Sequence, residues 1–327
     1  MLKHILKRIL ISIGILLAVS LIIYGLLRAL PANYVELRFG PLYMRGDLTR
    51  EQFDEIERAF GLNLGFFEGY FRWLGGVFQG NLGYSFSQQL PVGRVIAERM
   101  GLSFLISLVS VVISFVIAIP LGVLAAVKQY SKFDYISTAL VMMGISLPSF
   151  FFSGLIIRTF AVQLNWFPAS GIIDPSLPPD TSTFMVNMNR AYHLVLPITV
   201  SVILGIGGLM RYTRTNTLEV LRSDFIRTAR AKGLGEGTVI FKHAFKNTGI
   251  PLATMMAGIL PGLFAGSMVI EQLFALPGIG YFAFQALQQG DIPFIMGYNM
   301  FLTILSVLGV LLVDITYVII DPRVKMN

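Results

Sequence analysis

The 327-residue chain contains no cysteine. This absence excludes disulfide bonds, thiolate nucleophiles and metals held by cysteine. Charge is scarce as well, because only 13% of the residues are charged, against about 25% in a typical soluble domain. Hydrophobic residues make up 55% of the chain, and the mean hydropathy is +0.72. This composition indicates a polytopic membrane protein.

Motifs for catalysis and nucleotide binding are missing too. The histidines at His4, His193 and His243 stand far apart, and neither H-E-x-x-H nor G-x-S-x-G occurs. No G-x-x-x-x-G-K-[ST] occurs, and the run 233–237 continues with Thr238 where G-x-G-x-x-G needs a glycine. A membrane-embedded hydrolase is therefore disfavoured. We expect no reaction, metal or cofactor on this chain, so the energy for any active work must come from another protein.

Six apolar runs approach the ~20 residues that a transmembrane helix needs. The first follows Lys3, Lys7 and Arg8 and resembles a signal peptide, but it is too long for a cleaved one and no A-x-A site follows Leu30. We therefore predict an all-α polytopic membrane protein whose first span is retained. Its six transmembrane helices are expected at roughly 9–30, 102–127, 135–160, 191–210, 251–275 and 298–320.

The basic residues predict an orientation. All eight lysines and seven of the arginines fall on one side of this topology. The positive-inside rule then places both termini and the loop 211–250 in the cytoplasm. The opposite segment, 31–98, has six Arg against eight Asp and Glu. The net charge of +7 thus reflects topology, and we expect no nucleic-acid partner.

The segment 31–98 is too long for a simple connection. Thr49 and Gln52 have the spacing of a helix capping box. The aromatic run that follows, Phe66 to Trp73, suits a helix lying at the membrane interface. We expect an extracytoplasmic loop domain here, which is either a lid over the ends of the spans or a docking platform for an external partner.

The spans themselves are interrupted. Pro120 interrupts the second, and the run 144–149 around Pro148 interrupts the third. In the fifth, glycines at 258, 262 and 266 form a small-residue stripe that lets helices approach closely. Bent helices that pack through small residues suit a moving assembly, although they also occur in static bundles.

Ionisable groups within the spans are few. Arg158 either snorkels to the headgroups or lines a substrate cavity, for which Ser146 and Ser149 are further candidates. Glu271 is expected to be a structural partner. Asp314 stands too isolated to indicate the ion-coupled site of a secondary carrier, which should also show paired repeats.

The loop 211–250 concentrates the charge that the rest of the chain lacks. It has eight Lys and Arg against three acidic residues, between two apolar runs. Within it, Asp224 is a candidate N-cap for a short helix over 225–232. Gly233 is placed to end that helix as the residue after the C-cap. A helix of about 12 Å is marginal in water, so we expect a partner protein to hold it.

The run from Asp224 to Leu234 reads DFIRTARAKGL. It resembles the EAA loop of ABC-importer permeases, and specifically the form D-Y-[VI]-R-T-A-R-A-K-G-L of the oligopeptide/dipeptide permease family. Arg227, Thr228 and Ala229 fall on the three positions that name the motif, and Gly233 falls on its glycine. The long segment after the first span resembles the B-type subunit.

Further stretches are similar to the same family. They are Tyr70 to Ser85, Pro120 to Ala126, Gly144 to Phe150, Trp166 to Gly171, Glu271 to Gly280 and Asp321 to Val324. The chain departs from the family pattern in the Gly/Arg-rich insert between Pro31 and Asp47. It departs again at Arg158, where the family is usually apolar.

The resemblance implies a type I ABC-importer permease fold and a subunit that is not an enzyme. It divides the chain into 1–98, the first helix with its external loop, and 99–327, the core permease domain. The implied partners are a second, C-type permease, two cytoplasmic ATPases that carry ATP and Mg, an extracytoplasmic binding protein, a peptide substrate and the lipid bilayer. Nickel, metal-chelate or glycan cargo is the alternative within this class. The implied ATPase-coupling residues are Asp224, Phe225, Arg227, Thr228, Ala229, Arg230, Ala231, Lys232, Gly233 and Leu234.

Overall fold

A computed structural model describes residues 2–29, 33–59 and 63–320, without the side chains of 2–9, 250, 253–254, 256–257 and 313–320. The side chain of Asp314 and the closing run from Asp321 to Val324 therefore lie outside the described residues. The chain is mostly helical and divides into two units, each described here by itself. One unit holds the residues up to Gly101 and those from Gly278 onward, and the other holds Leu102–Pro277.

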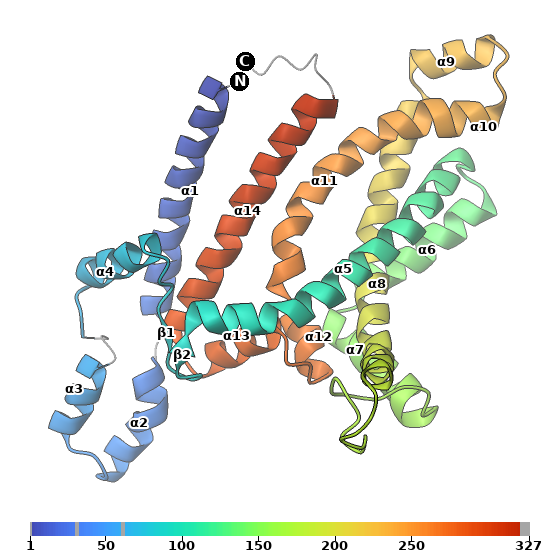
Figure 1. Ribbon diagram of the computed structural model, residues 1–327. Helices are drawn as coiled ribbons and strands as arrows, with labels where there is room; N and C mark the ends of the chain where they lie inside the picture. The colour runs from blue at the N-terminus through green and yellow to red at the C-terminus, as the bar shows by residue number, and fades with distance from the viewer. Residues whose placement is uncertain (1, 30–32, 60–62, 321–327) are drawn as a thin grey trace. The chain divides into compact units, whose positions relative to one another are not determined.

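The first unit contains short helices, one small hairpin and two long apolar helices (Figure 1). Its elements are α1 (Leu2–Arg28), α2 (Tyr34–Arg45), α3 (Arg50–Ala59), α4 (Phe66–Phe78), β1 (Tyr84–Ser85), β2 (Leu90–Pro91), the start of α5 (Val92–Val127), α13 (Ile279–Gln288) and α14 (Ile292–Ile320). The antiparallel strands pair Tyr84 with Pro91 and Ser85 with Leu90.

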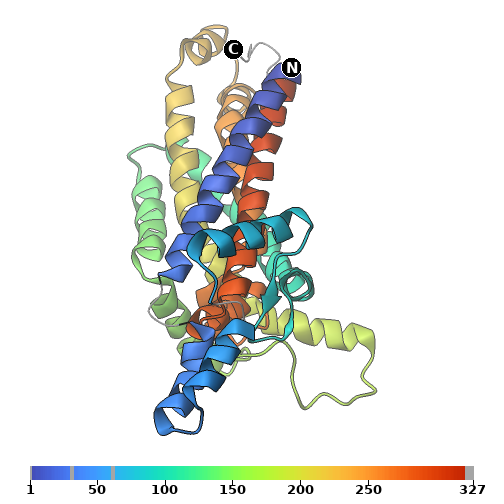
Figure 2. The ribbon, with the colours of Figure 1, turned by 90° about the vertical axis from the view of Figure 1, so that its left-hand side faces the viewer.

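Helices α1 and α14 pack side by side, and α4 lies across the end of α1 (Figure 1, Figure 2). The capping box predicted at Thr49 is confirmed, because its N–H donates to Gln52 Oε1 at 2.9 Å and its Oγ1 accepts from Gln52 N at 3.3 Å. The aromatic run forms the expected amphipathic helix α4, in which Tyr70 and Leu74 are buried and Phe71 is exposed.

A buried carboxylate fastens the hairpin of this unit to the start of α14. Asp291 is fully buried, and its Oδ2 accepts from Ser85 Oγ at 2.6 Å and from the N–H and Oγ of Ser87 at 2.9 and 2.7 Å. Its Oδ1 accepts from Phe294 N–H at 3.2 Å, which caps the first turn of α14. Four donors satisfy this carboxylate, as a buried charge requires.

The second unit contains the remaining helices and two π-helical segments. Its elements are the rest of α5, α6 (Lys132–Ser146), α7 (Ser149–Ile156), η1 (Ile157–Gln163), α8 (Thr183–Leu221), α9 (Asp224–Ala231), α10 (Glu236–Thr238), η2 (Val239–Ala244), α11 (Phe245–Ala265) and α12 (Met268–Leu273). Its buried residues include Val200 and Phe274 in one apolar cluster and Ala125 and Met210 in another.

Two predicted spans are broken in this unit. The third changes direction by 104° between α6 and the pair α7 and η1, because Leu147 precedes Pro148 and takes an extended conformation. The fifth ends as a continuous helix at Ala265, since Gly266 has a φ of +67°. Of the three glycines predicted to form a small-residue stripe, Gly258 and Gly262 lie on α11, whereas Gly266 ends this helix and is not part of the stripe.

The structure has four helices long and apolar enough to cross a membrane, or five if the bent pair counts as one span, among the residues searched. They include α1, α5, α8 and α14. This supports the coarse prediction of a multi-pass helical membrane protein. A close contact fixes α5 against α8, because a Cβ added to Gly122 would lie 2.8 Å from both Met210 O and Thr213 Cβ.

Candidate functional site

The short helix predicted in the polar loop is present as α9, Asp224–Ala231. Its N-cap is Ser223, so the prediction of Asp224 as the cap is wrong by one residue. Ser223 turns its Oγ toward Val220 O at 2.6 Å and does not cap the helix with its side chain. Asp224 instead stands in the first turn, where a carboxylate suits the helix dipole.

The end of α9 confirms the predicted role of Gly233, whose φ is +74°. Gly233 N–H donates to Arg230 O at 2.9 Å, and Leu234 N–H donates to Ala229 O at 3.4 Å. These two bonds form a Schellman motif, which needs a left-handed residue that glycine adopts without strain. The loop therefore turns sharply into Glu236 and α10.

One face of α9 is buried against the protein's own chain. Ile226 is fully buried and Ala229 is 6% exposed, in a cluster with Val239 and Ala244 of η2. Val220, in the last turn of α8, packs against the same cluster. The protein's own chain therefore holds this helix on one side, and the expected partner protein stays a prediction. Ile226 was not among the predicted site residues, although its i, i+3 spacing with Ala229 marks an apolar face.

An exposed ion pair fixes the turn after α9. Arg230 Nε and Nη2 donate to the two carboxylate oxygens of Glu236 at 2.8 and 3.1 Å. The hydrogen bond from Arg230 lowers the pKa of Glu236 from its ordinary value. The stabilisation is thus present above the ordinary glutamate pKa and lost as the pH falls through the lowered value. Exposed pairs add little free energy, so this pair mainly sets geometry.

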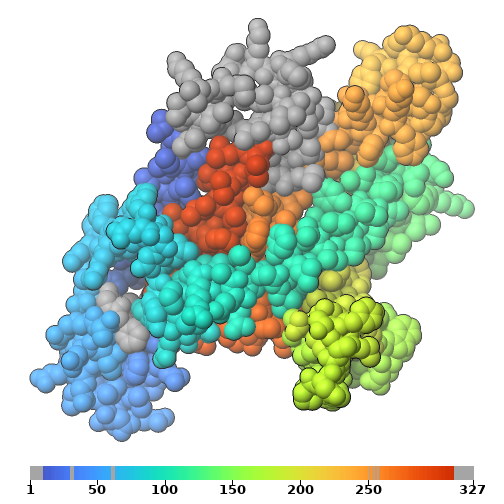
Figure 3. Space-filling model, in the orientation of Figure 1, coloured from blue at the N-terminus to red at the C-terminus, as the bar shows by residue number. Residues whose placement is uncertain are grey.

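The other face of α9 is open. Phe225 is 46% exposed, and Arg227, Thr228 and Lys232 are exposed around it. Phe241 of η2 is also exposed. In the space-filling view the segment holding α9 and α10 stands out as a knob at one end of its unit (Figure 3). Helix α9 thus has an inner face that packs against η2 and the end of α8, and an exposed outer face that is apolar and basic.

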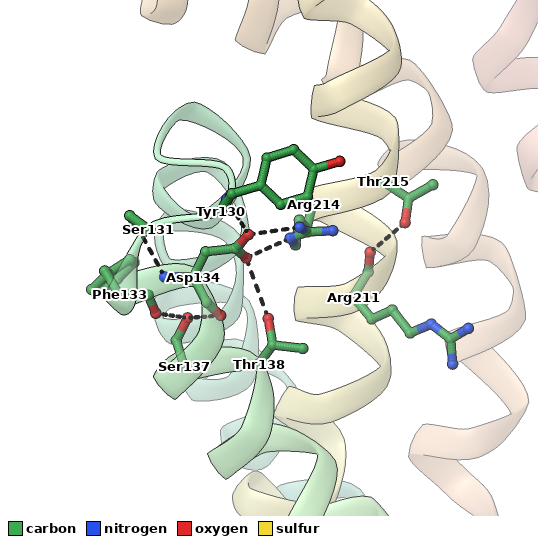
Figure 4. A network of polar contacts seen from close by, with 9 residues as sticks. All are labelled: Tyr130, Ser131, Phe133, Asp134, Ser137, Thr138, Arg211, Arg214 and Thr215. Carbon is green, nitrogen blue, oxygen red and sulfur yellow. Dashed lines mark hydrogen bonds and ion pairs between the residues drawn. The ribbon is translucent and has the colours of Figure 1, made fainter.

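A second charge pair lies between α6 and α8 (Figure 4). Arg214 Nε and Nη2 donate to the two oxygens of Asp134, both at 2.7 Å. Asp134 also accepts from Tyr130 N–H at 3.0 Å, and its side chain is 4% exposed against 25% for Arg214. The pair joins the α5–α6 turn to the part of α8 that leads to α9. Arg214 was one of the basic residues that predicted the orientation of the chain. Its positive charge is therefore paired with Asp134.

The second unit also contains a cavity of about 530 Å³ between α5, α8, α11 and α12. Its polar lining includes Ser107, Ser110, Ser114, Ser201 and Glu271. Glu271 is 2% exposed and accepts from Ser103 Oγ at 2.7 Å and Ser267 N–H at 3.1 Å. The carboxylate thus joins α5 to the break after α11, which matches its predicted structural role.

The three predicted cavity residues lie elsewhere in this unit. Ser146 ends α6, Ser149 begins α7, and Arg158 is exposed on η1. None of them lines the cavity of about 530 Å³. They belong to the two arms of the bent third span, so their predicted role in a substrate path stays a prediction.

These features define a class: a multi-pass helical membrane protein with an ordered helix in a polar loop between two of its long helices. Two family descriptions match the sequence. "Binding-protein-dependent transport system inner membrane component" matches residues 118–326, and the N-terminal description of such components matches residues 1–109. The chain belongs to this family, and it is a permease component of an ABC transporter. The resemblance read from the loop is thereby confirmed.

Relatives are similar over the whole chain. The oligopeptide transport system permease protein AppB of Bacillus subtilis is 38% identical over 99% of this chain and 100% of its own length. A putative peptide permease protein of Brucella suis is 33% identical over the full length of both chains. The dipeptide transport system permease protein DppB of Alkalihalophilus pseudofirmus is 30% identical over 99% of this chain and 100% of its own.

The packing of α9 predicts that Ile226→Ala loosens this helix. Truncating a buried isoleucine costs about 2 kcal/mol or more, so amides of α9 should exchange hydrogen at least about tenfold faster. Hydrogen exchange followed by mass spectrometry measures this. Phe225→Ala is the matched control, since its side chain is exposed. Equal exchange in the two variants would contradict the inward face assigned to Ile226.

The ion pair between Arg214 and Asp134 predicts that Arg214→Gln destabilises the protein by roughly 2–3 kcal/mol. The substitution leaves the carboxylate of Asp134 buried without its cation. Thermal unfolding in detergent should shift to lower temperature. Arg211→Gln removes the same charge one turn earlier on α8, from an exposed side chain. The account of this pair fails if both variants melt at the same temperature.

Proposed function

We propose that this chain is one of two paired permeases in an ATP-driven importer of oligopeptides or dipeptides. The observation that carries the proposal is helix α9, which is fastened to α8 and η2 on one side and open on the other. The fuel belongs to two ATPase subunits, which bind ATP and Mg. A C-type permease supplies the other half of the substrate path.

Peptide cargo is proposed from the relatives. The relatives described above are named for oligopeptide, peptide and dipeptide transport, and the similarity extends over nearly their whole lengths. Their membership of a binding-protein-dependent family supports an extracytoplasmic binding protein as the source of cargo. An uptake assay with labelled peptides tests this cargo. If the importer does not take up peptides, metal or glycan cargo is the alternative.

Force is proposed to pass from the ATPases through α9 into the membrane. An ATPase cleft holds the open face, with Phe225 as an apolar anchor and Arg227 and Lys232 beside it. When the ATPases close around ATP, α9 moves with the cluster formed by Ile226, Ala229, Val239 and Ala244. Because η2 continues into α11 and the cluster also holds the end of α8, both helices follow, in the manner of rocking transitions.

The proposed topology has six transmembrane helices, with α11 and the bent α6–α7 arm completing the set that α1, α5, α8 and α14 begin. Both termini and the loop 211–250 face the cytoplasm. Within the second unit, the ion pair of Asp134 with Arg214 supports this orientation, and Tyr130 N–H also donates to Asp134. The pair brings the basic α5–α6 turn to the same end as the loop. Residues 1–98, with the external helices, are proposed to meet the binding protein, and 99–327 form the core permease domain.

The cavity between α5 and α8 is the proposed part of the substrate path that this chain supplies. A cavity of about 530 Å³ falls within the size range of small-molecule sites. Three of its serines, Ser110, Ser114 and Ser201, donate their hydroxyl hydrogens to backbone carbonyls of the protein. Their oxygens are left to accept hydrogen bonds, which suits the backbone N–H groups of peptide cargo that differs in side chains. Arg158, Ser146 and Ser149 are proposed to act further along the path, where the partner permease completes its wall.

Docking through the open face predicts that Phe225→Glu weakens ATPase binding without unfolding the permease. This substitution leaves the buried cluster of Ile226, Ala229, Val239 and Ala244 unchanged. The chain should therefore still reach the membrane. Co-purification of the ATPase subunits and substrate-stimulated ATP hydrolysis should both fall at least about tenfold, because an aromatic anchor of an interface contributes about 2 kcal/mol or more.

The matched control is Phe184→Glu, which changes an exposed phenylalanine at the opposite end of α8. It should leave ATPase co-purification unchanged. Full ATPase retention by Phe225→Glu, or equal losses in both variants, would refute docking at α9. Uptake of labelled dipeptides and longer peptides by the unaltered importer tests the cargo separately.

A further inference from the structure

A second pocket, of about 450 Å³, lies in the first unit and is separate from the loop and the cavity described above. Residues of α1, α3, α4, the hairpin and the start of α14 line it. Three arginines, Arg28, Arg58 and Arg72, are among the lining residues, and the described lining residues include neither Asp nor Glu. The positive charge of this lining contrasts with segment 31–98 as a whole, which has more acidic than basic residues.

Two of these arginines are available to a ligand. Among the described residues, neither Arg58 nor Arg72 has an ion pair or a side-chain hydrogen bond, and both are exposed. Arg28 differs, since its Nη2 donates to the carbonyl of Leu64. Guanidinium groups gathered without carboxylates favour an anion with several oxygens, such as a phosphate.

An unsatisfied donor lies in the same wall. Trp73 lines the pocket, and its Nε1–H is buried without a hydrogen-bond partner in the described part of the chain. A buried donor left without an acceptor is costly, so an acceptor oxygen supplied by a ligand would satisfy it. Tyr24, Tyr84 and Phe86 add aromatic rings to the wall.

The position of the pocket on the spans points to a lipid. Arg28 is in the last turn of α1, and Ile292 and Met296 are in the first turns of α14, so the pocket joins the ends of two apolar helices at one membrane face. Helix α4, which supplies Arg72 and Trp73 to the wall, also carries the exposed rings of Phe67 and Phe71, at 67% and 65%. Aromatic and cationic side chains at the end of a span mark the headgroup layer.

We propose that this pocket binds the phosphate of an anionic phospholipid headgroup, with Arg58 and Arg72 holding the phosphate oxygens and Trp73 Nε1–H donating to one of them. The lipid fills the corner between α1 and α4 and steadies the first unit at the membrane surface. This inference does not rest on the proposed function, since it needs only the membrane position of α1 and α14.

The test compares retention of phosphatidylglycerol and phosphatidylcholine by the full chain in native mass spectrometry. The unaltered chain should retain phosphatidylglycerol in preference. The double variant Arg58→Gln/Arg72→Gln should lose that preference, with retention falling at least about tenfold as two charge-assisted bonds are removed. The control Arg38→Gln/Arg45→Gln removes the same charge from exposed side chains of α2 that do not line the pocket.

A second readout uses the two tryptophans of the chain. In a Trp166→Phe background Trp73 is the sole fluorophore, and phosphatidylglycerol brominated near its glycerol should quench it at lower mole fraction than brominated phosphatidylcholine. Equal retention and quenching in the pocket and control variants would overturn the proposal. Displacement of the lipid by millimolar inorganic phosphate would also overturn it, because the site would then belong to a free anion.

Discussion

The inner face of α9 is the contact on which the mechanism depends. Ile226 and Ala229 lie against Val239 and Ala244, so a helix of only eight residues becomes part of the structure that ends α8 and begins α11. Burying one isoleucine contributes about 1.5–3 kcal/mol, which offsets the weak helix formation of so short a segment. In the proposed mechanism, a partner bound to the outer face would therefore move the membrane helices rather than only the loop.

Within each unit, buried carboxylates join helices to neighbouring segments. Asp134 with Arg214 joins α6 to α8, Glu271 with Ser103 joins the break after α11 to α5, and Asp291 joins the hairpin to α14. In a chain with so little charge, each buried carboxylate has hydrogen-bond donors that satisfy it. These contacts hold short helices and helix breaks in place. The arrangement suits the proposed permease, whose parts would move as bodies while ATP binds to partner subunits.

Long apolar runs, capping signals and a left-handed glycine could be predicted from the sequence because they depend on neighbouring residues. The four long apolar helices α1, α5, α8 and α14, the capping box at Thr49 and the turn at Gly233 are of this kind. Helix α2 was not predicted, although Asn33 and Glu36 have the spacing of its capping box. The partners of Asp134 and of Ile226 depend on packing between distant segments, so no local pattern predicts them. The peptide cargo and the coupling role of the loop were predicted from the resemblance to the oligopeptide/dipeptide permease family.

The claim that α9 and η2 move as one body is tested most directly by a distance between them. Because the chain has no cysteine, Thr228→Cys/Lys242→Cys places two spin labels on exposed sites of α9 and η2 without other changes. Double electron–electron resonance on the assembled importer should give the same distance distribution without nucleotide and with ATP trapped. A shift or broadening of several ångströms between the two states would show that α9 detaches from η2, and would contradict the account.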